Sequence, residues 1–372
     1  MAFVFVVLFA AYDSTLPNIS SAKPPKFMIV GYVFSRANIY GIGAEKLTHI
    51  NYAFGLVSKD GEIVLNNPDA PARLSQLQAL KAKNPALKII LSVGGWGADN
   101  FSEAALSDAS RDKFAKSAVD FIRRYALDGI DLDWEYPGQP GPGISYRPED
   151  KENFTYLLKT LREQIDALSN ERGRKGTDRY TLTIASAAGD YFKYTEMDKL
   201  HVYLDWINIM TYDFYTSSAK TTGHHTGLYR SLSAGDSNEY TEASVKQHLD
   251  AGIPSRKLVV GAAFYGRSFS GVKLENHGLY QPYEQYAGQH SYSELTRDFI
   301  DKQGFKRFWD DAAKAPYLWN GDSRTFITYD DPESLKAKAE FVKQHRLGGM
   351  MYWEHSHDPA EILLSTIFEN LR

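Results

Sequence analysis

The sequence predicts an α/β fold, a (β/α)₈ TIM barrel with a small α+β insertion between its seventh strand and its last helix. Two observations predict it: eight short β-branched or aromatic runs alternate with amphipathic patterns, and one of these runs ends in a row of acidic residues. An open doubly wound sheet is the structural alternative, but eight repeats favour closure. The chain has 372 residues and is 43% hydrophobic, which suits one large barrel with an insertion.

The expected strands are short and rich in Val, Ile, Leu and aromatic residues, as buried parallel strands are. They are Met28–Val33, Thr48–Phe54, Lys88–Val93, Gly129–Trp134, Thr181–Ser186, Trp206–Tyr212, Leu258–Phe264 and Gly349–Trp353.

Helical patterns lie between these strands. In Arg111–Leu127, apolar residues recur at three- and four-residue spacing, and Asp108 is expected to cap the start of the helix. The other expected helices are Arg73–Lys83, Glu149–Leu168, Thr241–Ala251 and Asp331–His345.

Residues 270–328 interrupt the alternation and are rich in Tyr, Gly and charge. This interval is too long for a simple strand-to-helix loop. We expect an α+β insertion that walls one side of a cleft, with residues 23–269 and 329–372 forming the catalytic barrel. A long ordered loop without substrate contact is the alternative.

Residues 1–22 are expected to be a leader segment, because Ala2–Ala11 forms an apolar run of signal-peptide length. That run is shorter than the roughly 20 residues needed to span a bilayer. Although no Lys or Arg precedes it, export to the cell exterior or the periplasm is favoured over a buried or disordered N-terminal segment. We therefore expect a secreted protein without stable membrane association.

The composition excludes several classes of site and partner. The absence of cysteine excludes disulfides, thiolate metal sites and thiol nucleophiles. The net charge is −4 and no long basic run occurs, which argues against nucleic acid as a partner. No metal or organic cofactor is implied, and a monomer is expected.

The most informative segment runs from Asp128 to Glu135 and reads DGIDLDWE. In a strand, Asp131, Asp133 and Glu135 point to one side, while the apolar residues between them point to the other. Successive acidic side chains are then about 6.5–7 Å apart. A calcium-binding loop fits poorly, because it has a central Gly and no strand-like alternation. We interpret the row as three carboxyl groups facing the barrel interior.

Three carboxylates in a poorly solvated space cannot all remain ionised. At least one proton should be retained near neutral pH, as a general acid requires. Glu135 is the longest of the three side chains and lies nearest the C-terminal end of the strand. It is therefore best placed to reach a substrate at the barrel mouth.

This segment resembles the D-x-x-D-x-D-x-E signature of the family 18 glycoside hydrolases, the chitinases. The resemblance covers about Phe27 to His357, and the long insertion resembles that of the bacterial-type subfamily A. Further matching segments end the third, sixth, seventh and eighth strands: Ser92–Trp96, Met210–Asp213, Phe264–Arg267 and Trp353–Glu354. Two positions depart from the family pattern: Phe214-Tyr215 follows Asp213 where many relatives have His-Gly, and Ala263 replaces a frequent Pro.

The resemblance implies a chitinase that cuts chitin or chitooligosaccharides with retention, through an oxazolinium ion formed by the substrate's own N-acetyl group. It implies that Glu135 is the general acid, that Asp133 orients the acetamido group, and that Asp131 completes the acidic set. It further implies that Tyr212 is the fourth catalytic residue and donates to the acetamido oxygen. The implied substrate-binding residues, of which Tyr32 and Ser92 hydrogen-bond Asp131, are Tyr32, Ser92, Trp96, Met210, Asp213, Arg267 and Trp353.

Two other functions remain open at this point. The same chemistry could act on N-glycan cores, as an endo-β-N-acetylglucosaminidase, or on peptidoglycan. A non-catalytic chitin-binding lectin on the same barrel is the alternative from a different class, but such relatives typically lack one of the acids, and here all are present.

Overall fold

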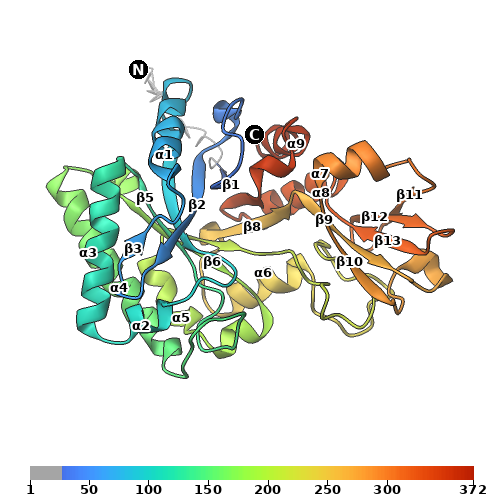
Figure 1. Ribbon diagram of the computed structural model, residues 1–372, viewed down its shortest axis with the longest axis horizontal. Helices are drawn as coiled ribbons and strands as arrows, with labels where there is room; N and C mark the ends of the chain where they lie inside the picture. The colour runs from blue at the N-terminus through green and yellow to red at the C-terminus, as the bar shows by residue number, and fades with distance from the viewer. Residues whose placement is uncertain (1–26) are drawn as a thin grey trace, which may run out of the picture.

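The computed structural model describes residues 27–372, and these form a barrel with a second, smaller sheet beside it (Figure 1). The expected leader at residues 1–22 lies outside the described residues.

The barrel consists of eight parallel strands in the order β1-β14-β8-β7-β6-β5-β4-β2, and pairing of β1 with β2 closes it. A short strand, β3 (Ile63–Val64), continues the sheet antiparallel to β2. All eight strands coincide with the segments expected from the sequence, so the predicted fold class is confirmed. Their bounds are β1 Met28–Phe34, β2 His49–Val57, β4 Lys88–Gly94, β5 Gly129–Asp133, β6 Thr181–Ser186, β7 Trp206–Ile209, β8 Leu258–Ala263 and β14 Gly349–Trp353.

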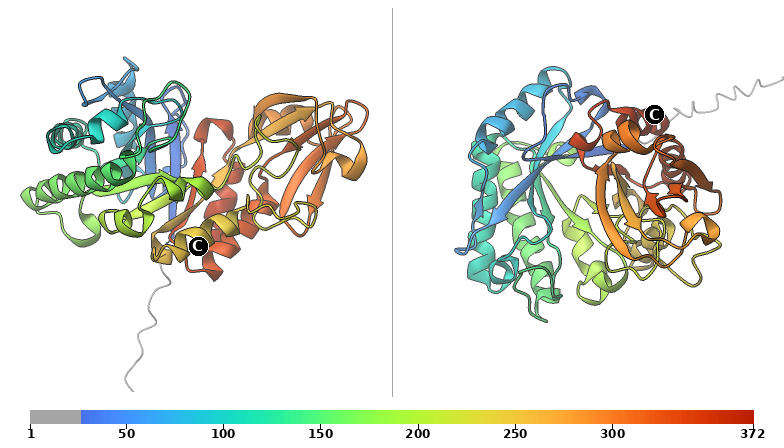
Figure 2. Two further views of the ribbon diagram at one scale, coloured as in Figure 1. Left: turned by 90° about the horizontal axis from the view of Figure 1, so that it is seen from below. Right: turned by 45° about the vertical axis from the view of Figure 1, so that its right-hand side comes forward.

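Helices follow the strands and cover the outside of the barrel (Figure 2). The five expected helices form, with ends shifted by a few residues. The helices of this layer are α1 Ala70–Ala79, α2 Phe101–Ala105, α3 Asp108–Tyr125, α4 Asp150–Glu171, α5 Met197–Leu200, α6 Thr241–Asp250, α8 Pro332–Gln344 and α9 Ile362–Leu371.

Helix α3 is capped by Ser107, and the expected cap at Asp108 is therefore wrong. Ser107 has an extended backbone, its hydroxyl accepts from the Ser110 N–H, and Ser110 returns a hydrogen bond to the Ser107 N–H. Asp108 is already the first residue of the helix, where an acidic group favours the positive end of the helix dipole. Sequence alone did not separate two adjacent residues that both favour a helix start.

The second sheet is antiparallel and has the strand order β10-β9-β13-β12-β11. It begins at Tyr265, before the insertion expected at Ser270, because the chain leaving β8 pairs at once with β10 and β13. Aromatic side chains form its own core, including Phe269, Tyr317 and Phe326. Its elements are β9 Tyr265–Ser270, β10 Gln285–Ser291, α7 Tyr292–Glu294, β11 Lys306–Asp310, β12 Ala315–Asn320 and β13 Thr325–Thr328.

A buried ion pair ties this sheet to the barrel. The Lys338 Nζ on α8 lies 2.7 Å from Asp330 Oδ2 and 2.6 Å from Thr226 Oγ1. The Asp330 carboxylate also accepts the backbone N–H of Ala263, at the end of β8. A buried charge needs partners of this kind, so the loop after β7, the end of β8 and the exit from the second sheet are held together.

Side chains of the barrel strands pack into two separate clusters. The larger lies between the strands and the helices and contains Ile130, Leu132 and Trp134 of β5 and its end. The smaller fills the barrel and contains Val30, Tyr32 and Met351. The polar side chains of β5 therefore belong to the inner side of the barrel.

Candidate active site

The acidic side chains of β5, the acidic row of Asp131, Asp133 and Glu135, face the barrel interior. They are 0%, 5% and 9% exposed, respectively. On the opposite side of the strand, the Trp134 ring stacks on Phe101 of α2 with centroids 5.3 Å apart. The alternation expected from the sequence therefore holds, and it brings three carboxyl groups into one enclosed space.

Asp131, at the deep end of the row, accepts four hydrogen bonds. Oδ2 accepts from Tyr32 Oη and Ser92 Oγ, each at 2.8 Å. Oδ1 accepts from Thr183 Oγ1 at 2.6 Å and from Asn208 Nδ2 at 3.2 Å. Burial raises the pKa of Asp131, and the four hydrogen bonds oppose that rise. Asp131 is thus a fixed anchor beneath the other two acids.

Asp133 and Glu135 have far fewer partners than Asp131. Within residues 27–372, the buried Oδ1 of Asp133 has no hydrogen-bond partner. Burial, followed by the charges of Glu135 and Asp131, raises the pKa of Asp133 well above its ordinary value. Burial also raises the pKa of Glu135 to about 7, while a hydrogen bond from Tyr136 opposes the rise. The two acids together therefore retain protons close to neutral pH.

The backbone beside the row requires glycine. Gly94 ends β4 with φ +124°, and a Cβ there would lie 2.0 Å from the carbonyl oxygen of Asp133. The next residue, Gly95, donates its N–H to that same oxygen at 2.8 Å. The glycine pair after Ser92 thus allows the loop that carries Trp96 to pass directly over the end of β5.

The ends of β7 and β14 add aromatic side chains above the row. The Trp353 ring stacks on Phe54, with centroids 5.5 Å apart and planes at 18°, and lies 5.8 Å from the Tyr32 ring. Tyr212 and Met210 pack against the inner cluster together with Trp353. Burial and the Asp133 charge raise the pKa of Tyr212, so its hydroxyl stays protonated and able to donate.

A second acidic group, which we call the Asp213 corner, comprises Asp213, His225, Tyr265 and Arg267. Asp213 Oδ1 accepts from Arg267 Nε at 2.6 Å and from Tyr265 Oη at 2.7 Å, and Arg267 Nη2 lies 2.6 Å from Oδ2. Burial acts to raise the pKa of Asp213, but the contacts with His225 and Arg267 outweigh it and hold the pKa below its ordinary range. Asp213 therefore stays ionised, and its negative charge in turn helps to raise the pKa of Glu135.

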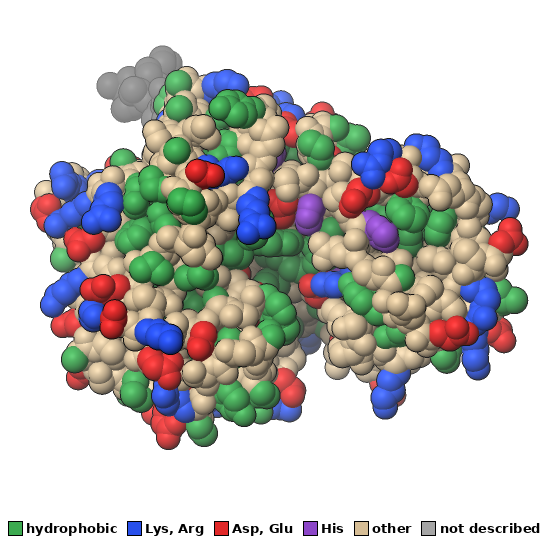
Figure 3. Space-filling model, in the orientation of Figure 1, with side chains coloured by type: hydrophobic (Ala, Val, Ile, Leu, Met, Phe, Trp, Pro, Cys, Tyr) green, Lys and Arg blue, Asp and Glu red, His purple; other side chains and the backbone are tan. Residues whose placement is uncertain are grey.

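A groove of about 650 Å³ crosses the ends of β1, β2, β4 and β14. Phe34, Phe54, Trp96 and Trp353 line it, and Trp96 is 66% exposed. Trp96 also lies 6.1 Å from the Tyr136 ring, next to Glu135. The space-filling view shows a hollow with apolar side chains on its floor, between the barrel and the second sheet (Figure 3). A chain of sugars could stack on these rings beside the acidic row.

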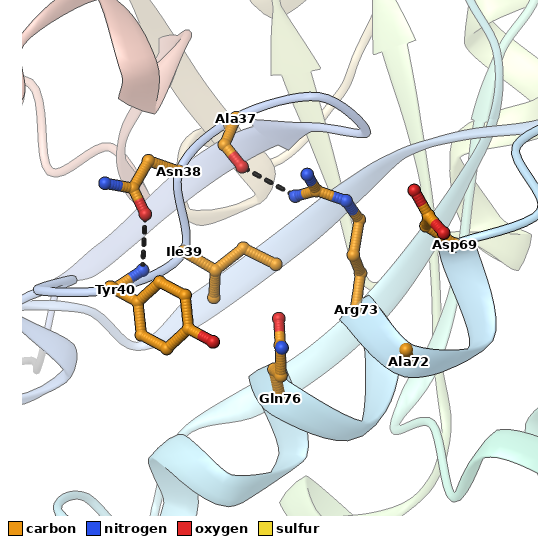
Figure 4. A pocket seen from close by; sticks show the side chains of 8 residues that line it. All are labelled: Ala37, Asn38, Ile39, Tyr40, Asp69, Ala72, Arg73 and Gln76. Carbon is orange, nitrogen blue, oxygen red and sulfur yellow. Dashed lines mark hydrogen bonds between the residues drawn. The ribbon is translucent and has the colours of Figure 1, made fainter.

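A smaller hollow of about 300 Å³ lies between the loop after β1 and helix α1 (Figure 4). In it, Arg73 Nη1 donates to the carbonyl oxygen of Ala37 at 2.6 Å, and Tyr40 is strongly exposed. Asp69 supplies its only carboxyl group among the lining residues. This hollow therefore lacks the paired acids that the acidic row provides.

Two predicted substrate-binding residues lie below the groove. Tyr32 and Ser92 are buried and bond Asp131, so they reach a ligand only through that carboxylate. Of the other predicted residues, Trp96 and Trp353 line the groove, Tyr212 and Met210 join the inner cluster, and Asp213 and Arg267 form the corner.

Several contributors were not predicted from the sequence. The signal for Asn208 was a polar residue inside an otherwise apolar strand, and for Thr183 it was the alternation of polar and apolar residues in β6. Tyr265 lies inside the matching segment Phe264–Arg267 but was given no role, and no comparable signal marked His225, which comes from a loop.

Residues 27–372 contain neither a membrane-spanning helix nor a group of side chains suited to a metal ion. The helices in this range are all too short or too polar to cross a bilayer. Within the same range, no three His, Cys, Asp or Glu side chains are grouped so that they could hold a metal ion.

A family model described as glycosyl hydrolases family 18 matches residues 28–358. Chitinase A1 of Niallia circulans is 38% identical, over 99% of this chain and 61% of the relative, so the chain spans less than two thirds of that protein. Chitinase B of Serratia marcescens is 33% identical, over 87% of this chain and 76% of the relative. A solved structure, described as a glycoside hydrolase family 18 N-acetylglucosaminidase from Paenibacillus barengoltzii, has a TM-score of 0.86 at 43% identity and covers 93% of this chain and 100% of that one.

Proposed function

Because the chain belongs to the glycosyl hydrolases family 18 and is therefore a glycoside hydrolase, we propose that it is a chitinase. It cleaves β-1,4 linkages between N-acetylglucosamine residues in chitin and chitooligosaccharides. The curated relatives named as chitinases and the aromatic groove support this substrate. The observation that carries the proposal is the inward-facing acidic row, in which Glu135 holds a proton near neutral pH next to that groove.

Glu135 is the general acid of the proposed reaction and protonates the leaving glycosidic oxygen. A carboxyl group with a pKa of about 7 is well matched to this task, since it is still protonated near neutral pH yet can release its proton in the transition state.

Asp133 does not act as the nucleophile. Retaining glycosidases that form a covalent intermediate use an ionised carboxylate about 5–5.5 Å from the acid. Here burial and the neighbouring carboxylates raise the pKa of Asp133 well above its ordinary value, which disfavours the ionised form that a nucleophile requires. This supports the substrate-assisted route, in which the N-acetyl oxygen attacks the anomeric carbon and gives an oxazolinium ion that water opens with retention. An intramolecular nucleophile has a high effective concentration, so the protein mainly has to orient it.

The remaining roles are those that the family resemblance implies, and the positions of the side chains support them. Asp133 contacts the acetamido N–H, and Asp131 shares the charge of the row from below. Tyr212 donates to the acetamido oxygen. Trp353 lies beneath the reacting sugar, Trp96 stacks on the leaving-group side, and Asp213 with Arg267 binds sugar hydroxyls.

Product analysis tests the substrate. Chitohexaose and a high-mannose glycoprotein are incubated separately with the enzyme, and we expect oligosaccharides from the first and no glycan release from the second. Glycan release from the glycoprotein alone would instead favour an endo-β-N-acetylglucosaminidase. Release of single N-acetylglucosamine units from chitohexaose would place the enzyme with the Paenibacillus N-acetylglucosaminidase. Binding of chitohexaose without turnover would favour the lectin.

Export of the enzyme is also part of the proposal and is supported by the apolar run Ala2–Ala11, with residues 1–22 as the leader. Mass spectrometry of the protein recovered outside the producing cell tests it. A mature chain that begins near Lys23 is expected, and retention of an uncleaved chain inside the cell would contradict it.

A further inference from the structure

His225 is a buried imidazole on the protein side of the Asp213 corner. It lies in the loop between β7 and α6, and its side chain is 0% exposed. Two backbone hydrogen bonds fix its position: its N–H donates to Thr328 Oγ1 at 3.0 Å, and its carbonyl oxygen accepts from the Phe214 N–H at 3.1 Å. The loop is thus attached to β13 on one side and to the residue after Asp213 on the other.

The imidazole has one polar neighbour within ion-pair distance. Nδ1 lies 3.5 Å from Asp213 Oδ1, and the ring lies 5.2 Å from the Tyr265 ring. Among the described residues, no hydrogen bond is formed to either ring nitrogen. A buried N–H without a partner is costly, so Nδ1–H has a strong reason to point at the Asp213 carboxylate.

Asp213 stands between this imidazole and the open cleft. Its side chain remains 37% exposed while that of His225 is fully covered, and its backbone is in the left-handed region at φ +62°. The carboxylate already accepts from Arg267 and Tyr265, which both come from β9. Of these three contacts, only the one with His225 comes from the loop that follows Asp213 in the sequence.

We propose that His225 is a positioning residue: as a neutral imidazole it donates Nδ1–H to Asp213 from behind the cleft wall, and so holds that carboxylate facing the substrate and the acidic row. This role rests on the proposed function, in which Asp213 contacts the sugar and Glu135 is the acid.

Neutral His225 holds the carboxylate without cancelling its charge. The charged and titratable groups around the ring are Asp213 and Asp330, which favour its protonation, Arg267, which disfavours it, and the Tyr265 phenol. Asp330 is itself paired with Lys338. Burial outweighs the carboxylates and lowers the pKa of His225 below its ordinary value. Near neutral pH, Asp213 therefore keeps its full negative charge, which helps to hold the proton on Glu135.

Two substitutions separate positioning from packing, because one keeps a donor on a smaller side chain and the other keeps the packed volume without a donor. In His225→Asn, the side-chain Nδ2 is bonded to Cγ as the His Nδ1 is, so a donor remains near the same place. His225→Leu has similar shape but no donor. Kinetics on a chromogenic chitobioside over a range of pH, together with crystal structures of both variants, give the readouts.

We expect His225→Leu to lose about 10- to 100-fold in kcat/KM, mostly in kcat, and His225→Asn to stay within about threefold of the parent. In His225→Leu the fall in activity on the alkaline side should also move to lower pH by about half a unit, because a displaced Asp213 supports the Glu135 proton less well. The crystal structure of this variant should show the Asp213 side chain rotated away from its present position.

A third variant controls for stability. His248 is also buried, with ring nitrogens 2.8 Å from Ser186 Oγ and from the Ser244 carbonyl oxygen, but it lies on α6 away from the groove. His248→Leu should lower the melting temperature while leaving the pH profile in place.

The proposal is overturned if His225→Leu and His225→Asn show the same kinetics and pH profile, or if Asp213 keeps its position in His225→Leu. Lack of parent activity on every chitin substrate would reject the proposed function instead, and the Asp213 position in the two crystal structures would still decide the role of His225.

Discussion

Two groups of carboxyls in this molecule lie close enough to interact, one buried and one partly exposed, and their protonation differs. In the acidic row, Asp133 and Glu135 have no cationic partner among the residues that the structure describes, and burial raises their pKa values. In the Asp213 corner, the Arg267 guanidinium lies 2.6 Å from the carboxylate, and the pKa is lowered despite burial. Burial alone therefore does not set the protonation state. The presence of a cation decides which acid carries a proton and which carries a charge.

The largest expected effect comes from removing the proton donor in the acidic row. Glu135→Gln keeps the shape but cannot transfer a proton, so kcat should fall by roughly 10²–10⁴-fold while chitohexaose still binds. Glu163→Gln, on the exposed part of α4, is the matched control and should be as active as the parent. If Glu135→Gln turned over substrate nearly as fast as the parent, Glu135 would not be the general acid.

A smaller loss is expected when the anchor of the row is weakened. Thr183→Val removes one of the four hydrogen bonds to Asp131, and a charge-assisted hydrogen bond of this kind corresponds to about a tenfold loss in kcat. Thr181→Val is the control, since Thr181 lies on the same strand but contributes none of those four bonds. Equal activity of the two variants would show that Asp131 does not depend on this contact.

Neutralising an acid in each of the two groups should change the free energy of unfolding in opposite directions. Between about pH 4.5 and 7, folded Glu135 retains a proton that the unfolded chain has released, so the parent's free energy of unfolding falls as pH rises through this window. Glu135→Gln avoids that loss and should be more stable than the parent at pH 8 by about 1–3 kcal/mol, with no difference at pH 4.

Asp213 has a lowered pKa, so its contribution is present above the ordinary carboxyl pKa and is lost as pH falls below it. Asp213→Asn should therefore be less stable than the parent at neutral pH, by about 1 kcal/mol because water screens its exposed side. Urea unfolding of both variants at several pH values measures these differences. If both variants changed the free energy of unfolding in the same direction, the inferred difference in protonation between the two groups would be wrong.

The smallest effect is on the pH profile. With Glu135 at a pKa of about 7, kcat/KM for the parent should decline as pH rises through neutrality. Asp213→Asn removes a negative charge that raises this pKa, so the decline should move to lower pH by a fraction of a unit. A shift of the decline to higher pH would contradict the inferred effect of the Asp213 charge on the pKa of Glu135.

Much of the fold was predictable because it follows from local pattern. All eight barrel strands were found from apolar runs, and the inward row from simple alternation along β5. The start of the second sheet was placed too late, because the strand at Tyr265 is defined by partners far along the chain. Helix α9, which packs on α8, was not expected, although its buried residues recur at helical spacing.

The candidate site likewise has one part that was predictable from local sequence and one part that was not. Asp131, Asp133 and Glu135 share one strand, so their spacing predicts their common orientation. His225, Tyr265 and Asp213 meet only because the loop after β7 and the second sheet fold back on the barrel rim. No local sequence pattern predicts that these three residues lie next to one another.

The central claim is that Glu135 keeps its proton near neutral pH because it is buried in a row without cations. Infrared difference spectroscopy of the parent against Glu135→Gln, from about pH 4 to about pH 9, follows the protonated carboxyl directly. We expect the carbonyl band of protonated Glu135 to disappear as pH rises, with a midpoint near pH 7. A midpoint near 4.5, the ordinary value for glutamate, would contradict it.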